Sequence, residues 1–104
     1  MFALLALFLP YTISFDAEPS SVVMHVATTE KQTAMCPLKI YRKECVEGYL
    51  SLEIGRDLNG ICLMAFGPYR GTFHLELDEG DYDLWINDQY YGVLSYQEGE
   101  VLFQ

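Results

Sequence analysis

The sequence from residue 71 to residue 92 reads GTFHLELDEGDYDLWINDQYYG, and this stretch decides the fold class of the chain. Apolar and polar residues alternate on both sides of an acidic turn, with Leu75 and Leu77 before it and Tyr82, Leu84 and Ile86 after it. Alternation with a period of two, bounded by turn-forming residues, predicts two strands that each bury one face. We therefore expect a β-hairpin whose turn is formed by residues 78–81.

Other segments of the chain carry strand signals as well. We expect these strands over residues 21–27, 38–42, 49–54, 61–66 and 90–96. Most of them alternate, but residues 61–66 are apolar on both faces, which is typical of a central strand. No segment of sufficient length shows the period of an amphipathic helix. About seven short strands in one chain predict an all-β protein folded as a single antiparallel β-sandwich.

Both ends of the chain carry signals of their own. Residues 1–14 contain an apolar run closed by Pro10, of a length that suits a signal peptide and is too short for a membrane span of about 20 apolar residues. We expect a signal peptide or an N-terminal apolar segment, and a secreted or periplasmic protein, although no basic residue precedes the run. Residues 100–104 (EVLFQ) resemble the remnant left when a picornaviral-type protease removes a purification tag, and a native edge strand is the alternative. The sandwich domain is expected to span residues 15–99.

The charge of the chain limits its partners. The formal net charge is −9, and all six basic residues lie between Lys31 and Arg70. Affinity for nucleic acid is dominated by basic contacts with phosphate, so we exclude nucleic acid as a partner. Anionic membrane surfaces are disfavoured by the same reasoning, and we expect no membrane insertion of the mature chain.

The pattern over residues 47–96 resembles a known family. EGYLSLEIGRDLNGICLMAF (residues 47–66) is followed by FHLELDEGDYDLWINDQYYGVLSY (residues 73–96), and this order is similar to that of the small secreted immunoglobulin-like β-sandwich proteins of gut bacteria, whose function is largely uncharacterised. The pattern Leu-x-x-Gly-x-Tyr-x-Leu over residues 77–84 also recurs in transthyretin-like and carboxypeptidase-regulatory-like domains. The resemblance implies an immunoglobulin-like sandwich and supplies no catalytic residues.

The three cysteines, Cys36, Cys45 and Cys62, form no CxxC pair, which argues against a structural zinc site. Cys62 lies in the apolar segment 61–66, where a free cysteine behaves as a small buried hydrophobe. If the protein is secreted, a disulfide between Cys36 and Cys45 is an alternative that requires the chain to turn back near Lys43. No nucleophile can be paired with a base, so we expect no catalytic residue, and we expect no metal and no cofactor.

Aromatic residues beside polar ones give the first functional hypothesis. Such a surface combines apolar area with hydrogen-bonding groups and suits a protein or glycan ligand. In the expected hairpin, His74 lies opposite Trp85 on the exposed face. The candidate ligand-binding residues are His74, Trp85, Asn87, Tyr90 and Tyr91.

The acidic turn gives the alternative hypothesis. Its carboxylates are not balanced by any Lys or Arg between residues 76 and 100. A small acidic domain of this kind suits an inhibitor or immunity protein that blocks a basic enzyme or toxin, since charge complementarity speeds association. The residues of this acidic patch are Glu76, Asp78, Glu79, Asp81 and Asp83.

Overall fold

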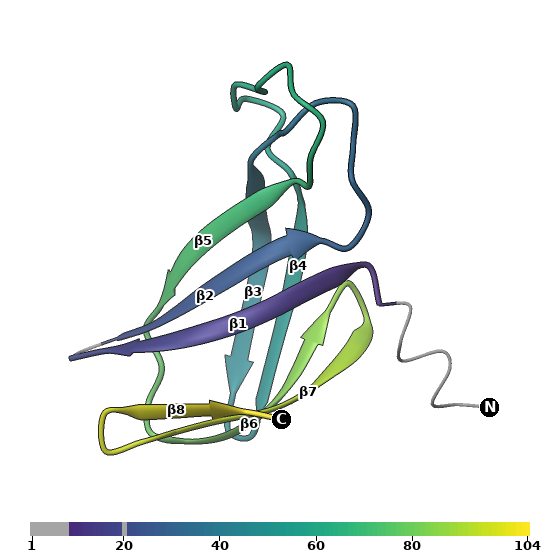
Figure 1. Ribbon diagram of the computed structural model, residues 1–104. Helices are drawn as coiled ribbons and strands as arrows, with labels where there is room; N and C mark the ends of the chain where they lie inside the picture. Colours follow the sequence, from purple (N-terminus) through teal and green to yellow (C-terminus); the bar gives the residue numbers. More distant parts are fainter. Residues whose placement is uncertain (1–8, 20) are drawn as a thin grey trace.

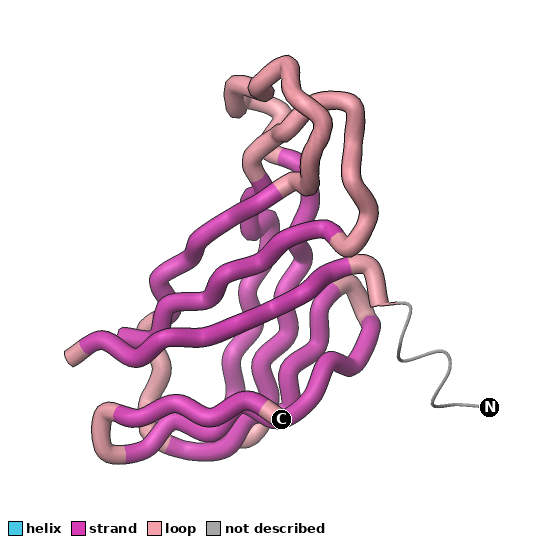
Figure 2. Tube along the Cα trace, in the orientation of Figure 1, coloured by secondary structure: helices cyan, strands magenta, loops and turns pink. Residues whose placement is uncertain are grey.

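The computed structural model describes residues 9–19 and 21–104, and in this part of the chain it contains strands and loops and no helix (Figure 2). Eight strands form two sheets packed face to face (Figure 1). The three-stranded sheet has the order β1-β2-β5, and the five-stranded sheet has the order β3-β4-β6-β7-β8. The strands are β1 (Tyr11–Glu18), β2 (Ser21–Thr28), β3 (Leu38–Val46), β4 (Tyr49–Arg56), β5 (Arg70–Leu75), β6 (Gly80–Ile86), β7 (Gln89–Gln97) and β8 (Glu100–Phe103).

The hydrophobic core lies between the two sheets. Met24 and Leu75 from the three-stranded sheet are fully buried, and so are Leu52, Leu84 and Leu94 from the five-stranded sheet. These side chains come from alternate positions of their strands, because successive residues of a strand point to opposite faces. In this two-layer arrangement each sheet has one face toward the core and one outer face, and successive side chains point to the two faces in turn, as the period-two pattern predicts.

The structure confirms the all-β, two-sheet class and corrects its details. The expected strands 21–27, 38–42, 49–54 and 90–96 coincide with β2, β3, β4 and β7. The number of strands is eight instead of seven, because β1 and β8 near the two ends join the sheets while the strand expected over residues 61–66 does not form. The sandwich is also not purely antiparallel, since β4 and β6 pair in parallel.

The hairpin expected over residues 71–92 is wrong in its pairing and right in its alternation. Leu75, Tyr82, Leu84 and Ile86 are buried as predicted, but β5 pairs with β2 in one sheet while β6 lies between β4 and β7 in the other. Residues 76–79 carry the chain from one sheet to the other. A period-two pattern specifies which face of a strand is buried, and both sheets bury their strands against the same core, so the pattern does not identify the partner strand.

The strand expected over residues 61–66 is absent, and these residues lie in an exposed loop. We call residues 57–69, which connect β4 to β5, the apical loop; Figure 1 shows it at the top of the molecule. Ile61 is 87% exposed and Met64 is 92% exposed. In a two-layer sandwich every strand has one solvent-facing side, so a segment that is apolar on both faces does not find a fully covered position.

The cysteine predictions are also corrected. Cys36 and Cys62 form a disulfide, with 4.2 Å between their Cα atoms, so Cys62 is not a free thiol and Cys36 does not pair with Cys45. Cys45 is free and exposed near the end of β3. The reason is geometric: β3 is extended over nine residues and carries Cys45 away from Cys36.

The two ends of the described chain are both in the sheets. Residues 11–14, which fall within the expected signal peptide or apolar segment, are part of β1, and residues 1–8 lie outside the described residues. The EVLFQ segment contributes β8, which pairs antiparallel with β7. The rings of Phe15 and Phe103 lie 5.1 Å apart, so β1 and β8 meet at one side of the sandwich. Within residues 9–19 and 21–104, no helix of the length and apolar character needed to span a membrane is present.

Candidate functional site

The structure does not bring the five predicted ligand-binding residues together. His74 lies on β5 in the three-stranded sheet, and its Nδ1 is 3.1 Å from Oε1 of Glu18. Trp85 lies on β6 in the other sheet, next to Tyr90 of β7. The expected cross-strand pairs of His74 with Trp85 and of Glu76 with Asp83 are therefore wrong, because they depended on the hairpin.

Asn87 has a structural role in this arrangement. It occupies the turn between β6 and β7 with a φ angle of 50°. Its side-chain Oδ1 accepts a hydrogen bond from the backbone N–H of Ile54, and its Nδ2 donates to the backbone carbonyl of Ile54, both at 2.9 Å. The amide therefore extends the contact between β4 and β6 beyond the strand ladder, with one donor and one acceptor engaged in holding the fold.

Tyr91 is directed toward the interior. Its side chain packs against the hydrophobic core, and burial raises the pKa of its hydroxyl to about 12. The hydroxyl oxygen is buried and has no hydrogen-bond partner among the described residues. Tyr91 is therefore part of the packing that supports the sheet.

Trp85 and Tyr90 do lie together, on the outer face of the five-stranded sheet. Their ring centroids are 5.4 Å apart with the planes tilted by 55°, a geometry that aromatic pairs favour. Trp85 is half-buried and Tyr90 is 45% exposed. The Tyr90 hydroxyl donates to Oδ1 of Asp83 at 3.4 Å, and partial desolvation together with this carboxylate raises the pKa of Tyr90.

Register places further side chains beside this pair. Ser51 of β4 is opposite Trp85, and Tyr49 is opposite Asp83. We call the surface formed by Tyr49, Ser51, Asp83, Trp85 and Tyr90 the aromatic face. It combines three aromatic rings with a hydroxyl and a carboxylate on one side of one sheet.

A groove of about 200 Å³ adjoins the aromatic face. Tyr49 and Ser51 belong to both surfaces, and the guanidinium of Arg42 lies 3.6 Å from the carboxylate of Glu44 within the groove. The groove offers hydrogen-bond donors and acceptors within reach of the rings. Its lining residues are Arg42, Glu44, Tyr49, Ser51, Glu53 and Asp88.

Four of the five predicted acidic-patch residues gather at the end of the molecule opposite the apical loop. They line a groove of about 640 Å³ together with Glu47 and the free Cys45, and we call it the acidic groove; the four are Glu76, Asp78, Glu79 and Asp81. Asp83 does not belong to it, because it lies on the aromatic face. The Glu79 carboxylate accepts a hydrogen bond from the backbone of Glu98.

Tyr82 is a buried residue that also lines the acidic groove. Its hydroxyl donates to the backbone carbonyl of Asp78 at 2.6 Å. Burial raises the pKa of Tyr82, and the nearby Cys45 and Asp78 raise it further. In the described residues, no three His, Cys, Asp or Glu side chains are grouped so that they could hold a metal ion. The expectation that the protein binds no metal stays a prediction.

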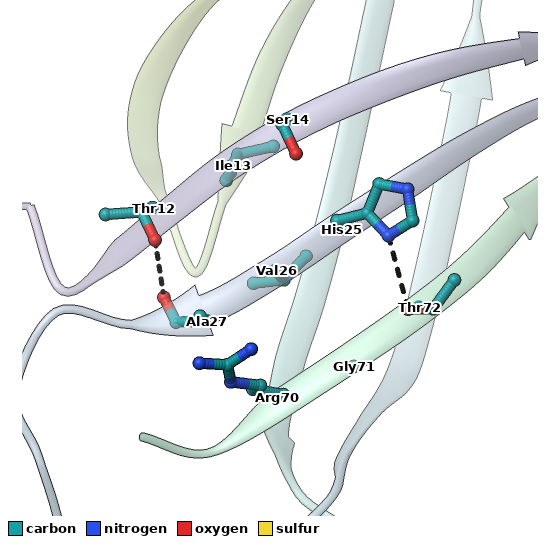
Figure 3. Close-up of a pocket in the computed structure, with 9 residues that line it drawn as sticks. All are labelled: Thr12, Ile13, Ser14, His25, Val26, Ala27, Arg70, Gly71 and Thr72. Atoms are coloured by element: carbon teal, nitrogen blue, oxygen red, sulfur yellow. Dashed lines mark hydrogen bonds between the residues drawn. The ribbon is translucent and has the colours of Figure 1, made fainter. Parts of the chain in front are cut away.

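A third surface, which the sequence did not indicate, lies on the outer face of the three-stranded sheet (Figure 3). Here a groove of about 250 Å³ runs over β1, β2 and β5 between His25 and Arg70. His25 Nε2 is 2.8 Å from Oδ2 of Asp16, and its Nδ1 is 3.3 Å from Oγ1 of Thr72. The three residues come from three strands, so only knowledge of the strand register would have revealed them.

The Asp16, His25 and Thr72 array resembles the carboxylate, imidazole and hydroxyl order of a hydrolase triad. Such a relay works in a site that excludes water and aims donors at the developing negative charge. Here the Asp16 side chain is 74% exposed and the His25 side chain is 43% exposed. We interpret the array as a set of cross-strand contacts that link β1, β2 and β5, each of which stabilises a sheet by about 0.2–1 kcal/mol.

Comparison with known proteins adds no relative. A scan against protein-family models, a search of curated proteins and a search of solved structures each found no match. The function of the chain is therefore argued from its own surfaces.

Proposed function

We propose that this protein is a noncatalytic binding module that recognises a glycan through the aromatic face. The observation that carries the proposal is the Trp85 and Tyr90 pair, which lies beside a polar groove on a sheet face that no further layer of described residues covers. Aromatic rings supply apolar area at low entropic cost, and the adjacent polar groups fix the orientation of a ligand. The sandwich itself we propose to be immunoglobulin-like, on the pattern of residues 47–96 and its two packed sheets.

A glycan fits the aromatic face better than a peptide does for two reasons. The C–H face of a sugar ring matches the exposed ring of Tyr90, while Ser51, Glu53 and Arg42 offer the alternating donors and acceptors that several hydroxyl groups need. The Cys36–Cys62 disulfide supports the secreted or periplasmic location in which free glycans and cell-wall glycans are met, since disulfides persist in oxidising compartments.

The test uses the intrinsic fluorescence of Trp85, which is the single tryptophan of the chain. Titration with a panel of oligosaccharides is expected to give a saturable change in emission, and Tyr90→Ala is expected to weaken the binding by about 30-fold, as truncation of a central aromatic contact does. The matched control is Tyr41→Ala, an exposed tyrosine of β3 that lies outside the aromatic face. If Tyr90→Ala and Tyr41→Ala weaken binding equally, the proposal is contradicted. If a protein binds saturably at the same face, the ligand is a protein and not a glycan.

A second function, inhibition of a basic enzyme or toxin, is favoured by one specific observation. The acidic groove concentrates four carboxylates of residues 76–81 with Glu47 around a concavity at one end of the molecule. If this end binds a basic partner, Asp78→Asn with Asp81→Asn should lower the association rate by about 10-fold and flatten its salt dependence. Glu44→Gln with Glu53→Gln removes the same charge outside the acidic groove and is the control.

A further inference from the structure

The apical loop exposes more large apolar side chains than any other segment that the structure describes. Leu58, Ile61, Leu63, Met64 and Phe66 are each between 62% and 92% exposed. From residue 61 to residue 66 no side chain carries a hydrogen-bond donor, since Cys62 is in the disulfide. Exposed large apolar side chains concentrated in one loop are typical of a site of interaction with a protein or a membrane.

The loop is held in one shape before it meets a partner. The Cys36–Cys62 disulfide fixes its middle to the segment that connects β2 with β3. On one side of the disulfide the backbone is paired as well: Met35 and Leu63 exchange hydrogen bonds at 2.9 and 2.8 Å, and Gln32 and Gly67 exchange them at 2.7 and 3.0 Å. Binding through a preformed loop avoids the entropic cost of ordering it.

Charge is segregated along the molecule, with the apical end positive. Residues 29–39 and 55–70, which include the apical loop and its base, contain four basic and two acidic residues and so carry a net charge of +2. Because the whole chain carries −9, the remaining residues carry −11. None of the basic residues lies within the exposed apolar segment 61–66. They are Lys31, Lys39, Arg56 and Arg70. In the described residues, no salt bridge neutralises any of these four side chains.

We propose that the apical loop inserts into the interface of an anionic lipid membrane. Ile61, Met64 and Phe66 would enter the boundary between headgroups and acyl chains, about 5–10 Å deep as for other surface-bound segments, while the basic residues at the base of the loop contact lipid phosphates. The insertion is shallow because irregular backbone is not tolerated in the hydrocarbon core, and the paired backbone at Leu63 and Gly67 lowers the cost at the boundary.

Two observations favour lipid over a protein groove. The apical loop projects beyond the ends of the strands (Figure 1). Its segment 61–66 lacks the polar and aromatic hydroxyl groups that protein contacts combine with apolar ones. The basic base of the loop also complements a negatively charged surface. This proposal reverses the expectation that the mature chain does not insert into a membrane, which followed from the net charge of −9. The acidic groove lies at the end of the molecule opposite the apical loop (Figure 1), and salt screens charges over about 8 Å.

The experiment measures co-flotation of the full chain with vesicles of phosphatidylcholine, with and without phosphatidylglycerol. Binding is expected to require phosphatidylglycerol, and Met64→Asp is expected to lower the partition coefficient by about 100-fold. The control is Val46→Asp, which places the same charge on an exposed apolar residue at the other end of β3 and is expected to bind normally. Because residues 1–8 are apolar too, all variants retain them, so the difference between Met64→Asp and Val46→Asp isolates the loop.

The basic residues are tested separately. Lys31→Gln with Arg56→Gln is expected to lower binding to anionic vesicles by about 30-fold. The proposal is overturned if the wild-type chain does not float with anionic vesicles, or if Met64→Asp and Val46→Asp bind equally. Sedimentation velocity supplies a further outcome: a dimer that Met64→Asp converts to a monomer would show that the loop binds a second copy of the chain, which would also overturn it.

Discussion

Residues 61–66 and residues 82–86 are both short apolar segments, and the protein uses them in opposite ways. The first, ICLMAF, contains no charged residue and is displayed on the apical loop. The second, YDLWI, contains Asp83 and forms the middle of the five-stranded sheet, with Leu84 and Ile86 fully buried. In a two-layer sandwich the ability to face both core and solvent matters more than total hydrophobicity, and only the alternating segment has it.

The largest effect should come from the buried segment. Leu84→Ala is expected to lower the free energy of unfolding by about 4 kcal/mol, because Leu84 is fully buried and the truncation leaves a cavity in the core. Urea denaturation measures the change. A loss below about 0.5 kcal/mol would mean that β6 does not present this residue to the core.

Removing the disulfide should have the next largest effect, on the exposed segment. Cys36→Ser with Cys62→Ser is expected to cost about 3 kcal/mol, because the bond closes a span of 26 residues and restricts the unfolded chain. The same denaturation experiment measures it, and limited proteolysis should then cut first within residues 57–69. Cys45→Ser, at an exposed free cysteine, is the control and should leave stability unchanged. Equal effects in both variants would contradict the pairing.

The anchoring of the buried segment to β4 can be tested at Asn87. Asn87→Gly introduces a residue that tolerates the φ angle of 50° but removes both hydrogen bonds to Ile54. It is expected to lower the free energy of unfolding by about 1–2 kcal/mol. Asp88→Gly is the matched control, because Asp88 also has a positive φ and makes no such contact with β4. If the two substitutions have the same effect, the side-chain amide does not hold the strands together.

The smallest effect is expected at the tip of the apical loop. Met64→Ala should change the free energy of unfolding by less than about 0.5 kcal/mol, because the side chain is almost fully exposed and leaves no cavity. A loss comparable to that of Leu84→Ala would show that the loop packs against the rest of the chain, and the contrast between the two segments would disappear.

The sequence predicted the faces of the strands and failed on their partners. Tyr82, Leu84 and Ile86 were assigned to the core from alternation alone, and they are buried. Alternation carries no information about which sheet a strand joins, so β5 and β6 were paired with each other when each belongs to a different sheet. β1 was overlooked because its first residues, 11–14, were assigned to an N-terminal apolar segment.

The candidate sites were predictable only where neighbours in the sequence remain neighbours in space. Trp85 and Tyr90 flank one tight turn, so their proximity followed from the sequence. The pairing of Asn87 with Ile54 and of His25 with Asp16 and Thr72 joins distant strands and depends on register, which the sequence does not supply. Residues 61–66 were predicted to form a central strand with Cys62 as a free thiol, so neither their exposure nor the Cys36–Cys62 disulfide was predicted.

The parallel pairing of β4 and β6 has a consequence for how the chain folds. Between these two neighbours of one sheet the chain passes through β5, which belongs to the other sheet. The larger sheet therefore cannot be completed until the chain has crossed the core to the smaller sheet and returned, so the two sheets are expected to form, and to be lost, in a single cooperative transition. Contacts of such long sequence separation carry a high entropic cost in the transition state, which places refolding in the range of milliseconds to seconds that is typical of β-sandwiches.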